Sequence, residues 1–232
     1  MRKKIFTLLA IFLAFTAVTL QAQTVQDTLR HEVLLETDSG DIRIQLFNET
    51  PKHRDNFLRL VNSGAYDGVL FHRVIKDFMI QTGDVGSKKA KPGEAVGDTP
   101  ETYTVPAEIC FPKFFHHRGA LGAAREGDDV NPKRESSATQ FYIVWGHKFT
   151  DAQLDKVQQR LNERTDSTVQ LTPEMREAYK TVGGAPHLDG QYTIFGQVIE
   201  GLDIVDIIQC QPGDKNDRPL NDTRILRALV VK

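Results

Sequence analysis

The residues with the clearest chemical potential lie in the stretch 66–84, which contains an arginine, Arg73, and a glutamine, Gln81. If the chain folds back near Asp77, antiparallel pairing sets Arg73 opposite Gln81. Side chains alternate between the two faces of a strand, so both residues fall on one face together with apolar neighbours. The pattern therefore predicts a site that combines a fixed cation, an amide and apolar surface.

The predicted face carries Phe71, Arg73, Met79 and Gln81, with Ile75 paired to Met79. A half-buried arginine needs polar partners, and the Gln81 amide can accept a hydrogen bond from Arg73 and position it. The same pairing also fits a barrel strand that carries an ordinary surface arginine. Taken by itself, the hairpin leaves both interpretations open.

The elements around this hairpin are mostly strands. Residues 33–37 and 42–47 lie on either side of a turn at 38–40 and alternate mostly with period two, which predicts a second hairpin. Further strands are predicted over residues 141–145, 190–198 and 225–231, and a short helix over 202–208. This order predicts a mainly β fold, a closed antiparallel structure with a few covering helices.

Helices are predicted at two other places. One begins at Thr50 as the N-cap and ends at Gly64, which can adopt the left-handed conformation. Two more interrupt the strands between residues 148 and 186. Residues 150–153 fit a capping box, and Thr172 precedes a proline that suits the first position of the second helix.

The composition is that of an ordinary globular chain, with 232 residues, 40% of them hydrophobic and 26% charged. The net charge of −2 gives no basic excess to attract nucleic acid. His116 and His117 could ligate a metal, but no Cys, His or carboxylate spacing around them makes a site. His72 with Ser136 or Ser137 could suggest a hydrolase, but a Gly-x-Ser-x-Gly elbow is lacking. We therefore expect no metal, no cofactor and no nucleic-acid partner.

The first 22 residues have the layout of a secretory signal peptide. A positive region at residues 2–4 precedes an apolar run over 5–20, and Ala22 supplies a small residue for cleavage. An uncleaved anchor is the alternative, but the run is shorter than the ~20 residues that span a bilayer. Residues 23–32 are expected to be a short leader. The mature protein is expected to be exported, to a periplasm or out of the cell, without membrane attachment.

Two cysteines, Cys110 and Cys210, lie in the mature chain. An exported protein can join such a pair in a disulfide. The apolar neighbours of both residues suggest partly buried positions, which two free thiols fit equally well. The pairing stays open.

Four stretches, in order along the chain, resemble motifs of the cyclophilin family of peptidyl-prolyl isomerases. They are residues 66–84 around Phe71-His72-Arg73, 119–125 (Gly-Ala-Leu-Gly-Ala-Ala-Arg), 136–143 (Ser-Ser-Ala-Thr-Gln-Phe-Tyr-Ile) and 187–198 (His-Leu-Asp-Gly through Phe-Gly-Gln-Val). The resemblance implies an isomerase domain over residues 33–232, with 148–186 as a helical insertion. It also implies the fold, a closed eight-stranded antiparallel β-barrel capped by two helices.

The resemblance implies that Arg73 and Gln81 are the catalytic residues. Amide resonance opposes rotation about a peptide bond to proline, with a barrier of about 18–20 kcal/mol. A donor aimed at the proline nitrogen weakens that resonance, and a guanidinium is rigid, charged and rich in donors. Arg73 takes this role, while Gln81 holds the substrate backbone and Arg73. No bond breaks, so the reaction needs no nucleophile, metal or nucleotide.

The resemblance also implies a proline pocket and a groove for an extended peptide. The predicted substrate-binding residues are Phe78, Met79, Ala124, Arg125, Tyr142, His187, Leu188 and Tyr192. Without the resemblance, the apolar members would be interpreted as plain core packing. The chain departs from the family at Tyr192, where a His is frequent, at His187, where a Trp is frequent, and at Thr82, where a Gly is frequent. The change at His187 predicts weaker binding of cyclosporin.

The predicted function is isomerisation of Xaa-Pro bonds in exported proteins, which assists their folding. The expected partners are proline-containing peptides and unfolded or folding proteins, bound by a monomer. The alternative is a non-catalytic module that holds extended segments in the same groove as a chaperone or assembly factor. The presence of both Arg73 and Gln81 favours the enzyme.

Overall fold

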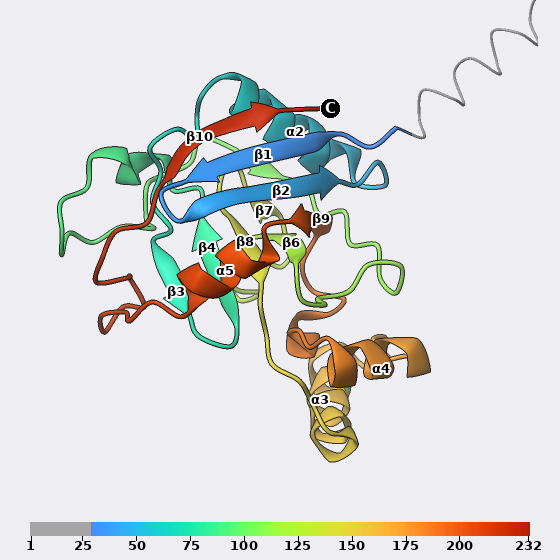
Figure 1. Cartoon of the computed structure of the whole chain (residues 1–232). Helices are drawn as coiled ribbons and strands as arrows, with labels where there is room; N and C mark the ends of the chain where they lie inside the picture. Colours follow the sequence, from blue (N-terminus) through green and yellow to red (C-terminus); the bar gives the residue numbers. More distant parts are fainter. Residues whose placement is uncertain (1–28) are drawn as a thin grey trace, which may run out of the picture.

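The structure is a computed structural model, and it describes residues 29–232 (Figure 1). The predicted signal peptide, residues 1–22, and most of the predicted leader, residues 23–32, lie outside the described residues. Within residues 29–232 no helix is both long and apolar enough to cross a membrane.

Eight strands form one antiparallel sheet in the order β10-β1-β2-β9-β6-β8-β4-β3. They are β1 (Glu32–Thr37), β2 (Gly40–Leu46), β3 (Arg73–Ile75), β4 (Met79–Thr82), β6 (Ala120–Ala123), β8 (Phe141–Val144), β9 (Ile194–Glu200) and β10 (Ile225–Val230). A separate pair joins β5 (Thr104–Val105) to β7 (Ser136–Ser137). The predicted mainly β class is confirmed.

The sheet is curled and open, so the prediction of a closed barrel is corrected. β3 and β10 are its edges. Residues 68–71, before β3, meet residues 223–225 through an isolated bridge from Leu70 to Arg224 and a few backbone hydrogen bonds, among them one from the Gly68 N–H to the Ile225 carbonyl at 2.7 Å. The pairing does not extend into a continuous ladder, since residues 211–224 form a loop rather than a strand.

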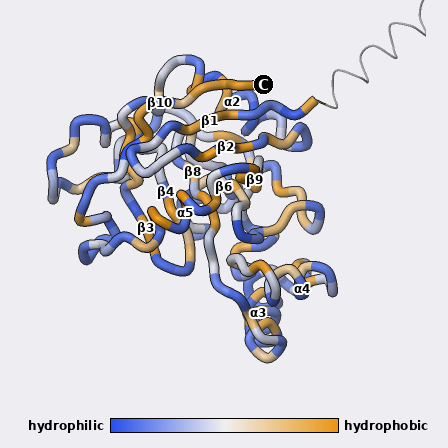
Figure 2. The backbone as a smooth tube through the Cα atoms, in the orientation of Figure 1, coloured by the Kyte–Doolittle hydropathy of each residue, from blue (hydrophilic) through white to orange (hydrophobic). Residues whose placement is uncertain are grey.

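Two helices cover the curled sheet, α2 (Pro51–Asn62) and α5 (Leu202–Gln209). α2 lies against β10, and α5 lies against β2, β3 and β4. Their apolar faces join the strands in one core, to which α2 contributes Phe57 and α5 contributes Val205. Figure 2 shows hydrophobic stretches along strands and α5, while the outer loops are mostly hydrophilic.

The start of α2 is held differently from the prediction. Thr50 occupies the N-cap position, but its side chain makes no capping hydrogen bond. Instead, the Glu108 carboxylate accepts hydrogen bonds from the backbone N–H groups of Lys52 (3.1 Å) and His53 (3.0 Å). A carboxylate at this end of a helix also interacts favourably with the helix dipole. The helix closes at Gly64, whose φ of 67° is the predicted left-handed conformation.

Helices α3 (Asp151–Arg164) and α4 (Pro173–Thr181) project from the sheet, in the range where the sequence predicts two helices (Figure 1). Thr150 and Gln153 form the predicted capping box, and Thr172 caps α4 through its side chain. The pair has its own small core, made of Leu154, Leu161, Val169, Leu171, Met175 and Tyr179. Phe111, Phe115 and Phe149 from outside the two helices also pack against this core, and α3 contacts the short helix η2 (Pro186–Leu188) as well as α4.

The two cysteines are free thiols. Cys110 is partly buried, as the sequence predicts, but Cys210 is exposed. The prediction fails at Cys210 because this residue follows the end of α5, where its thiol lies beside Asp206, with Sγ 3.6 Å from Oδ1.

We expect Glu108→Ala to lower the free energy of unfolding by about 1–3 kcal/mol, because two helix N–H groups and the buried His53 ring lose their acceptor. Glu49→Ala is the matched control, since Glu49 makes surface ion pairs with Arg30 and Lys113 worth about 0–1 kcal/mol. Urea unfolding followed by circular dichroism measures both variants. An equal loss in the two would contradict the capping role of Glu108.

Candidate active site

The hairpin that carries Arg73 and Gln81 has the predicted register. β3 and β4 pair antiparallel, with Arg73 opposite Gln81. Asp77 turns the chain with a φ of 59°, and its N–H donates to the Gln209 side chain of α5 at 2.7 Å. The helix therefore fixes the turn from which both predicted catalytic residues are aimed.

Phe71 does not share the face of Arg73, which corrects the predicted alternation. Its side chain is almost fully buried and packs in the main core with Val74 and Ile80. Alternation fails here because residue 71 precedes β3 and pairs elsewhere: its N–H donates to the carbonyl of Thr223 at 2.9 Å. Phe71 therefore anchors the strand from the inside.

A pocket of about 140 Å³ lies beside the hairpin. It brings together nine of the ten predicted site residues: Arg73, Phe78, Met79, Gln81, Ala124, Arg125, Tyr142, Leu188 and Tyr192. The tenth, His187, does not line it. This residue lies on the short helix η2 (Pro186–Leu188) and packs against Phe78, with ring centroids 5.2 Å apart. The grouping is that expected for a binding site, while the role of each residue stays a prediction.

Tyr142 forms the buried wall of the pocket. Its strand β8 lies between β4 and β6, so Tyr142 is opposite Gln81 on one side and Gly122 on the other. A Cβ at position 122 would lie 2.2 Å from the Tyr142 ring, so only glycine lets the ring cross β6. Burial raises the pKa of Tyr142 well above its usual value, which keeps the hydroxyl neutral.

The polar partners of Arg73 and Gln81 differ from the prediction. The Arg73 Nε pairs with Asp217 Oδ2 at 3.4 Å, and both side chains are more than 40% exposed. The Gln81 amide donates to the Gln140 side-chain oxygen at 3.1 Å. The predicted hydrogen bond from Arg73 to Gln81 is therefore not formed. An ion pair this exposed is weak, so the Arg73 guanidinium can turn towards a ligand at little cost.

A second cation, Arg125, is fixed beside the pocket. Its guanidinium carbon lies 4.4 Å from the centre of the Tyr192 ring. Its Nη1 pairs with Asp128 at 2.6 Å, and its Nε donates to the Gln191 carbonyl at 2.9 Å. Its Nη1 also donates to the Glu126 carbonyl at 2.8 Å. Because four partners hold this side chain, its part in the site is to shape the wall rather than to follow a moving ligand.

The backbone at positions 124 and 125 is only half available to a peptide. The Ala124 N–H donates to the Gln140 carbonyl, and the Ala124 carbonyl accepts from the Ser137 N–H. The Arg125 N–H and carbonyl have no such partner within residues 29–232. Of the two positions predicted to bind an extended peptide, Arg125 is the one that can pair with it.

A wider groove of about 700 Å³ continues from the pocket and shares Gln81, Ala124 and Arg125 with it. Four acids line the groove: Asp98, Glu101, Glu126 and Glu135. Glu101 is engaged by Ser137 and Thr139, and Glu135 accepts from Thr104. Asp98 and Glu126 are exposed. The groove therefore presents a negative field to a bound chain.

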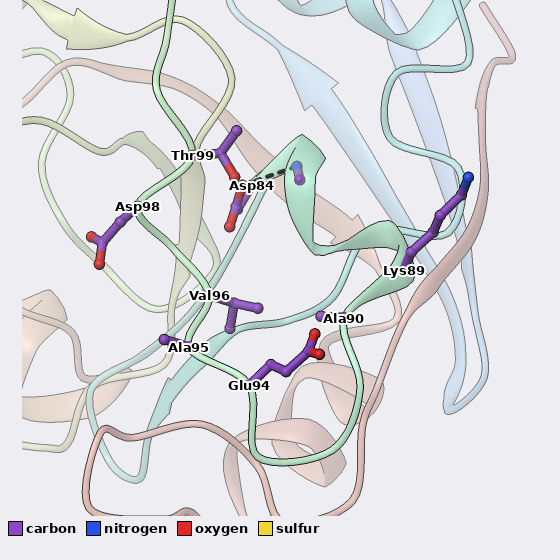
Figure 3. Close-up of a pocket in the computed structure, with 9 residues that line it drawn as sticks. Asp84, Lys89, Ala90, Glu94, Ala95, Val96, Asp98 and Thr99 are labelled. Carbon is purple, nitrogen blue, oxygen red and sulfur yellow. Dashed lines mark hydrogen bonds between the residues drawn. The ribbon is translucent and has the colours of Figure 1, made fainter.

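Another pocket, about 440 Å³ in volume, lies under the loop 90–99 and contains none of the predicted site residues (Figure 3). Its buried acid, Asp84, accepts from the N–H groups of Gly86 (3.0 Å) and Gly97 (2.6 Å). These bonds cap the short helix η1 (Val85–Lys89) and hold the loop. The Asp84 carboxylate is thus occupied by backbone, and this pocket serves the loop rather than the site.

Three residues had no role in the sequence prediction although they contact residues at or next to the site: Gln140 (Gln81), Asp217 (Arg73) and Asp189 (His116, behind Tyr142). Gln140 and Asp189 lie inside stretches that resemble family motifs, and this position could have indicated that they lie near the site. Asp217 lies in a polar loop, and nothing local indicates that it would meet Arg73. Within the described residues, no group of three or more His, Cys, Asp or Glu side chains is arranged to hold a metal.

Comparison with known proteins agrees with this geometry. Residues 32–230 match the model of the family described as cyclophilin type peptidyl-prolyl cis-trans isomerase/CLD. The chain is 34% identical to peptidyl-prolyl cis-trans isomerase-like 3 of Gallus gallus, across 83% of this chain and 91% of that protein. It is also 34% identical to a putative peptidyl-prolyl cis-trans isomerase of Staphylococcus aureus, across 84% and 88%.

Solved structures show the same likeness. A crystal structure of a cyclophilin type peptidyl-prolyl cis-trans isomerase from Cryptosporidium parvum matches with a TM-score of 0.61 and 26% identity, over 88% of this chain and 99% of that one. The same protein in the presence of the dipeptide Ala-Pro matches with a TM-score of 0.60 and 26% identity, over 87% and 99%.

Proposed function

This chain belongs to the cyclophilin-type peptidyl-prolyl cis-trans isomerases, and we propose that it isomerises Xaa-Pro bonds in exported proteins through the pocket beside the β3–β4 hairpin. One observation carries the proposal: Arg73, a weakly paired cation, lines an apolar pocket with Met79, Tyr142 and Leu188. The Ala-Pro dipeptide present with the Cryptosporidium relative supports proline-containing peptides as ligands.

In the proposed mechanism the apolar walls hold the proline ring while Arg73 acts on the amide. A guanidinium N–H directed at the proline nitrogen stabilises the pyramidal nitrogen of the twisted state, in which resonance is lost. In the planar cis and trans states the nitrogen lone pair is delocalised into the carbonyl group and accepts a hydrogen bond poorly. The interaction is therefore stronger in the twisted state, and it lowers the barrier rather than only binding the peptide. Gln140 orients Gln81, whose amide is placed to hold the substrate backbone.

The alternative, a non-catalytic module that holds extended segments, uses the same groove. The weak pairing of Arg73 favours the enzyme, because a surface that only binds extended segments does not require a cation that is free to reorient towards the proline nitrogen. Wild-type protein that lacks isomerase activity but suppresses aggregation of a proline-free client would favour the alternative.

We expect Arg73→Ala to lower kcat/KM on a proline peptide by on the order of 10²-fold, the effect of removing one donor that stabilises the transition state. Arg73→Lys keeps the positive charge but loses the planar set of guanidinium donors, so its kcat/KM should lie between those of the wild type and Arg73→Ala. Asp217→Asn, which removes only the exposed partner, should stay near wild type. A protease-coupled assay measures all three. Wild-type activity in Arg73→Ala would overturn the mechanism.

The acidic groove predicts a charge preference near the proline. A peptide with Lys within two residues of the proline should show a higher kcat/KM than its Glu counterpart, because the Lys meets the field of Asp98 and Glu126. Raising the ionic strength from about 0.01 M to about 1 M shortens the Debye length from about 30 Å to about 3 Å and should abolish the difference. The double variant Asp98→Asn, Glu126→Gln is the control. A preference that survives both changes would contradict an electrostatic origin.

Export is the remaining part of the proposal, supported by the positive and apolar segments before Ala22. We expect the purified native protein to begin at Gln23, as measured by intact mass and N-terminal sequencing, and to be found in the periplasm or the medium. A variant with Glu at positions 2–4 should be retained unprocessed. Full-length protein in the cytosol of wild-type cells would overturn the export proposal and leave the isomerase proposal untouched.

A further inference from the structure

A chain of buried hydrogen bonds runs from the wall of the pocket to helix α4. His116, Tyr179 and Asp189 have no exposed surface, and Tyr142 has 5%. The Tyr142 hydroxyl is 2.9 Å from His116 Nε2, and His116 Nδ1 is 2.9 Å from Asp189 Oδ1. The Tyr179 hydroxyl donates to Asp189 Oδ2 at 2.6 Å. We call these four residues the relay.

The directions of these bonds follow from the groups themselves. An ionised carboxylate only accepts, so His116 Nδ1 must carry the proton that it shares with Asp189. In neutral imidazole Nε2 is then an acceptor, and the Tyr142 hydroxyl donates to it. Asp189 also accepts from the His116 backbone N–H at 2.8 Å. The buried carboxylate thus has three donors, and the Tyr179 hydroxyl alone serves Oδ2 among the described residues.

The relay holds two walls of the pocket. Through His116 it fixes the hydroxyl end of Tyr142. Through Asp189 it fixes the turn that supplies Leu188 and Tyr192, which also line the pocket. The Tyr192 ring meets both His116 and Tyr142 edge to face, with centroids 6.2 Å and 6.1 Å apart. The positions of these lining residues relative to one another therefore depend on where the Asp189 carboxylate sits.

Tyr179 brings the helical pair into this arrangement. Its residue lies on α4, within the separate core of α3 and α4, and it does not line the pocket. The segment that follows α4 is also tied to the relay, because the Ala185 N–H donates to the His116 carbonyl at 2.8 Å. The hydrogen bond between Ala185 and His116 fixes how the helical pair sits against the site, and the Tyr179 hydroxyl fixes the orientation of the Asp189 carboxylate.

We propose that Tyr179 is a positioning residue for the proline pocket, acting through Asp189, His116 and Tyr142, so that the helical pair α3–α4 tunes substrate binding. The inference rests on the proposed use of the pocket. Loss of the Tyr179 hydroxyl leaves a buried carboxylate oxygen without its donor, and the carboxylate turns to find another partner. That movement carries His116 and the Tyr142 wall with it, while Arg73 on β3 is not displaced.

The test is Tyr179→Phe, which removes one oxygen and keeps the ring. We expect KM for a proline peptide to rise about threefold to tenfold, the range that one buried hydrogen bond spans, with kcat changed less than twofold. The Kd of the same peptide, measured by calorimetry, should rise in parallel. Tyr142→Phe and the double variant complete a cycle, in which Tyr179→Phe should have little further effect once the Tyr142 hydroxyl is gone.

Two controls separate positioning from loss of stability. Thr172→Ala removes the cap of α4 without touching the relay, and Tyr66→Phe removes another buried hydroxyl, which donates to the Thr139 carbonyl at 3.1 Å. Both should keep KM and Kd within twofold of wild type. An unchanged KM and Kd in Tyr179→Phe, an equal effect in Thr172→Ala, or full additivity with Tyr142→Phe each overturns the relay.

The outcome for the isomerase proposal is read separately. An inactive wild type would count against that proposal, and the peptide Kd values would still decide the relay. An active wild type with an unaffected Tyr179→Phe would overturn the relay alone. A wild type that neither turns over nor binds the peptide would overturn both.

Discussion

The position of β8 between β4 and β6 is the constraint on which the site depends. Tyr142 can form the wall of the pocket only because Gly122 leaves its face of β6 bare. The order of strands then places Arg73 on the edge strand β3, where it is half exposed beside a buried wall. A cation next to an apolar pocket thus follows from strand order and one glycine, without any strained backbone at the arginine itself.

Segments of this molecule are held by buried or half-buried acids that accept from backbone N–H groups elsewhere in the sequence. Glu108 holds the start of α2, Asp84 holds the loop at Gly97, and Asp189 holds the segment at His116. A buried carboxylate without donors is costly, so each of these contacts specifies one loop position against its alternatives. Asp189 is the one of these acids that acts at the pocket, since it lies next to Leu188, which lines it.

Local patterns predicted the parts of the fold that depend on near neighbours. The Arg73–Gln81 register, the capping box at Thr150 and the glycine end of α2 each involve residues a few positions apart. The motif resemblance gathered the pocket residues, and nine of ten indeed line one cavity. His187 packs against Phe78 instead of lining the pocket, and its position beside Leu188 in the sequence does not indicate which way its ring turns.

The failures share a cause, which is that a distant partner overrides a local rule. The side-chain face of Phe71 is set by its bond to Thr223, and the cap of α2 comes from Glu108 rather than from Thr50. The sheet stays open because residues 211–224, before β10, form a loop rather than a strand that pairs with β3. Contacts between residues so far apart in the chain produce no periodic pattern of hydrophobic and polar residues, so a single sequence does not reveal them.

An enzyme that breaks no bond has to distinguish two states that differ only by rotation about one bond. The proline ring must stay in place while the geometry of its nitrogen changes, so this task requires rigid walls and a donor that can reach the nitrogen of the twisted state. The two arginines differ in this respect: Arg125 is held by four partners, and Arg73 by one exposed carboxylate. Tightening the pair of Arg73 with Asp217 would therefore improve order and impair the proposed reaction, which is a reason for the weak contact seen here.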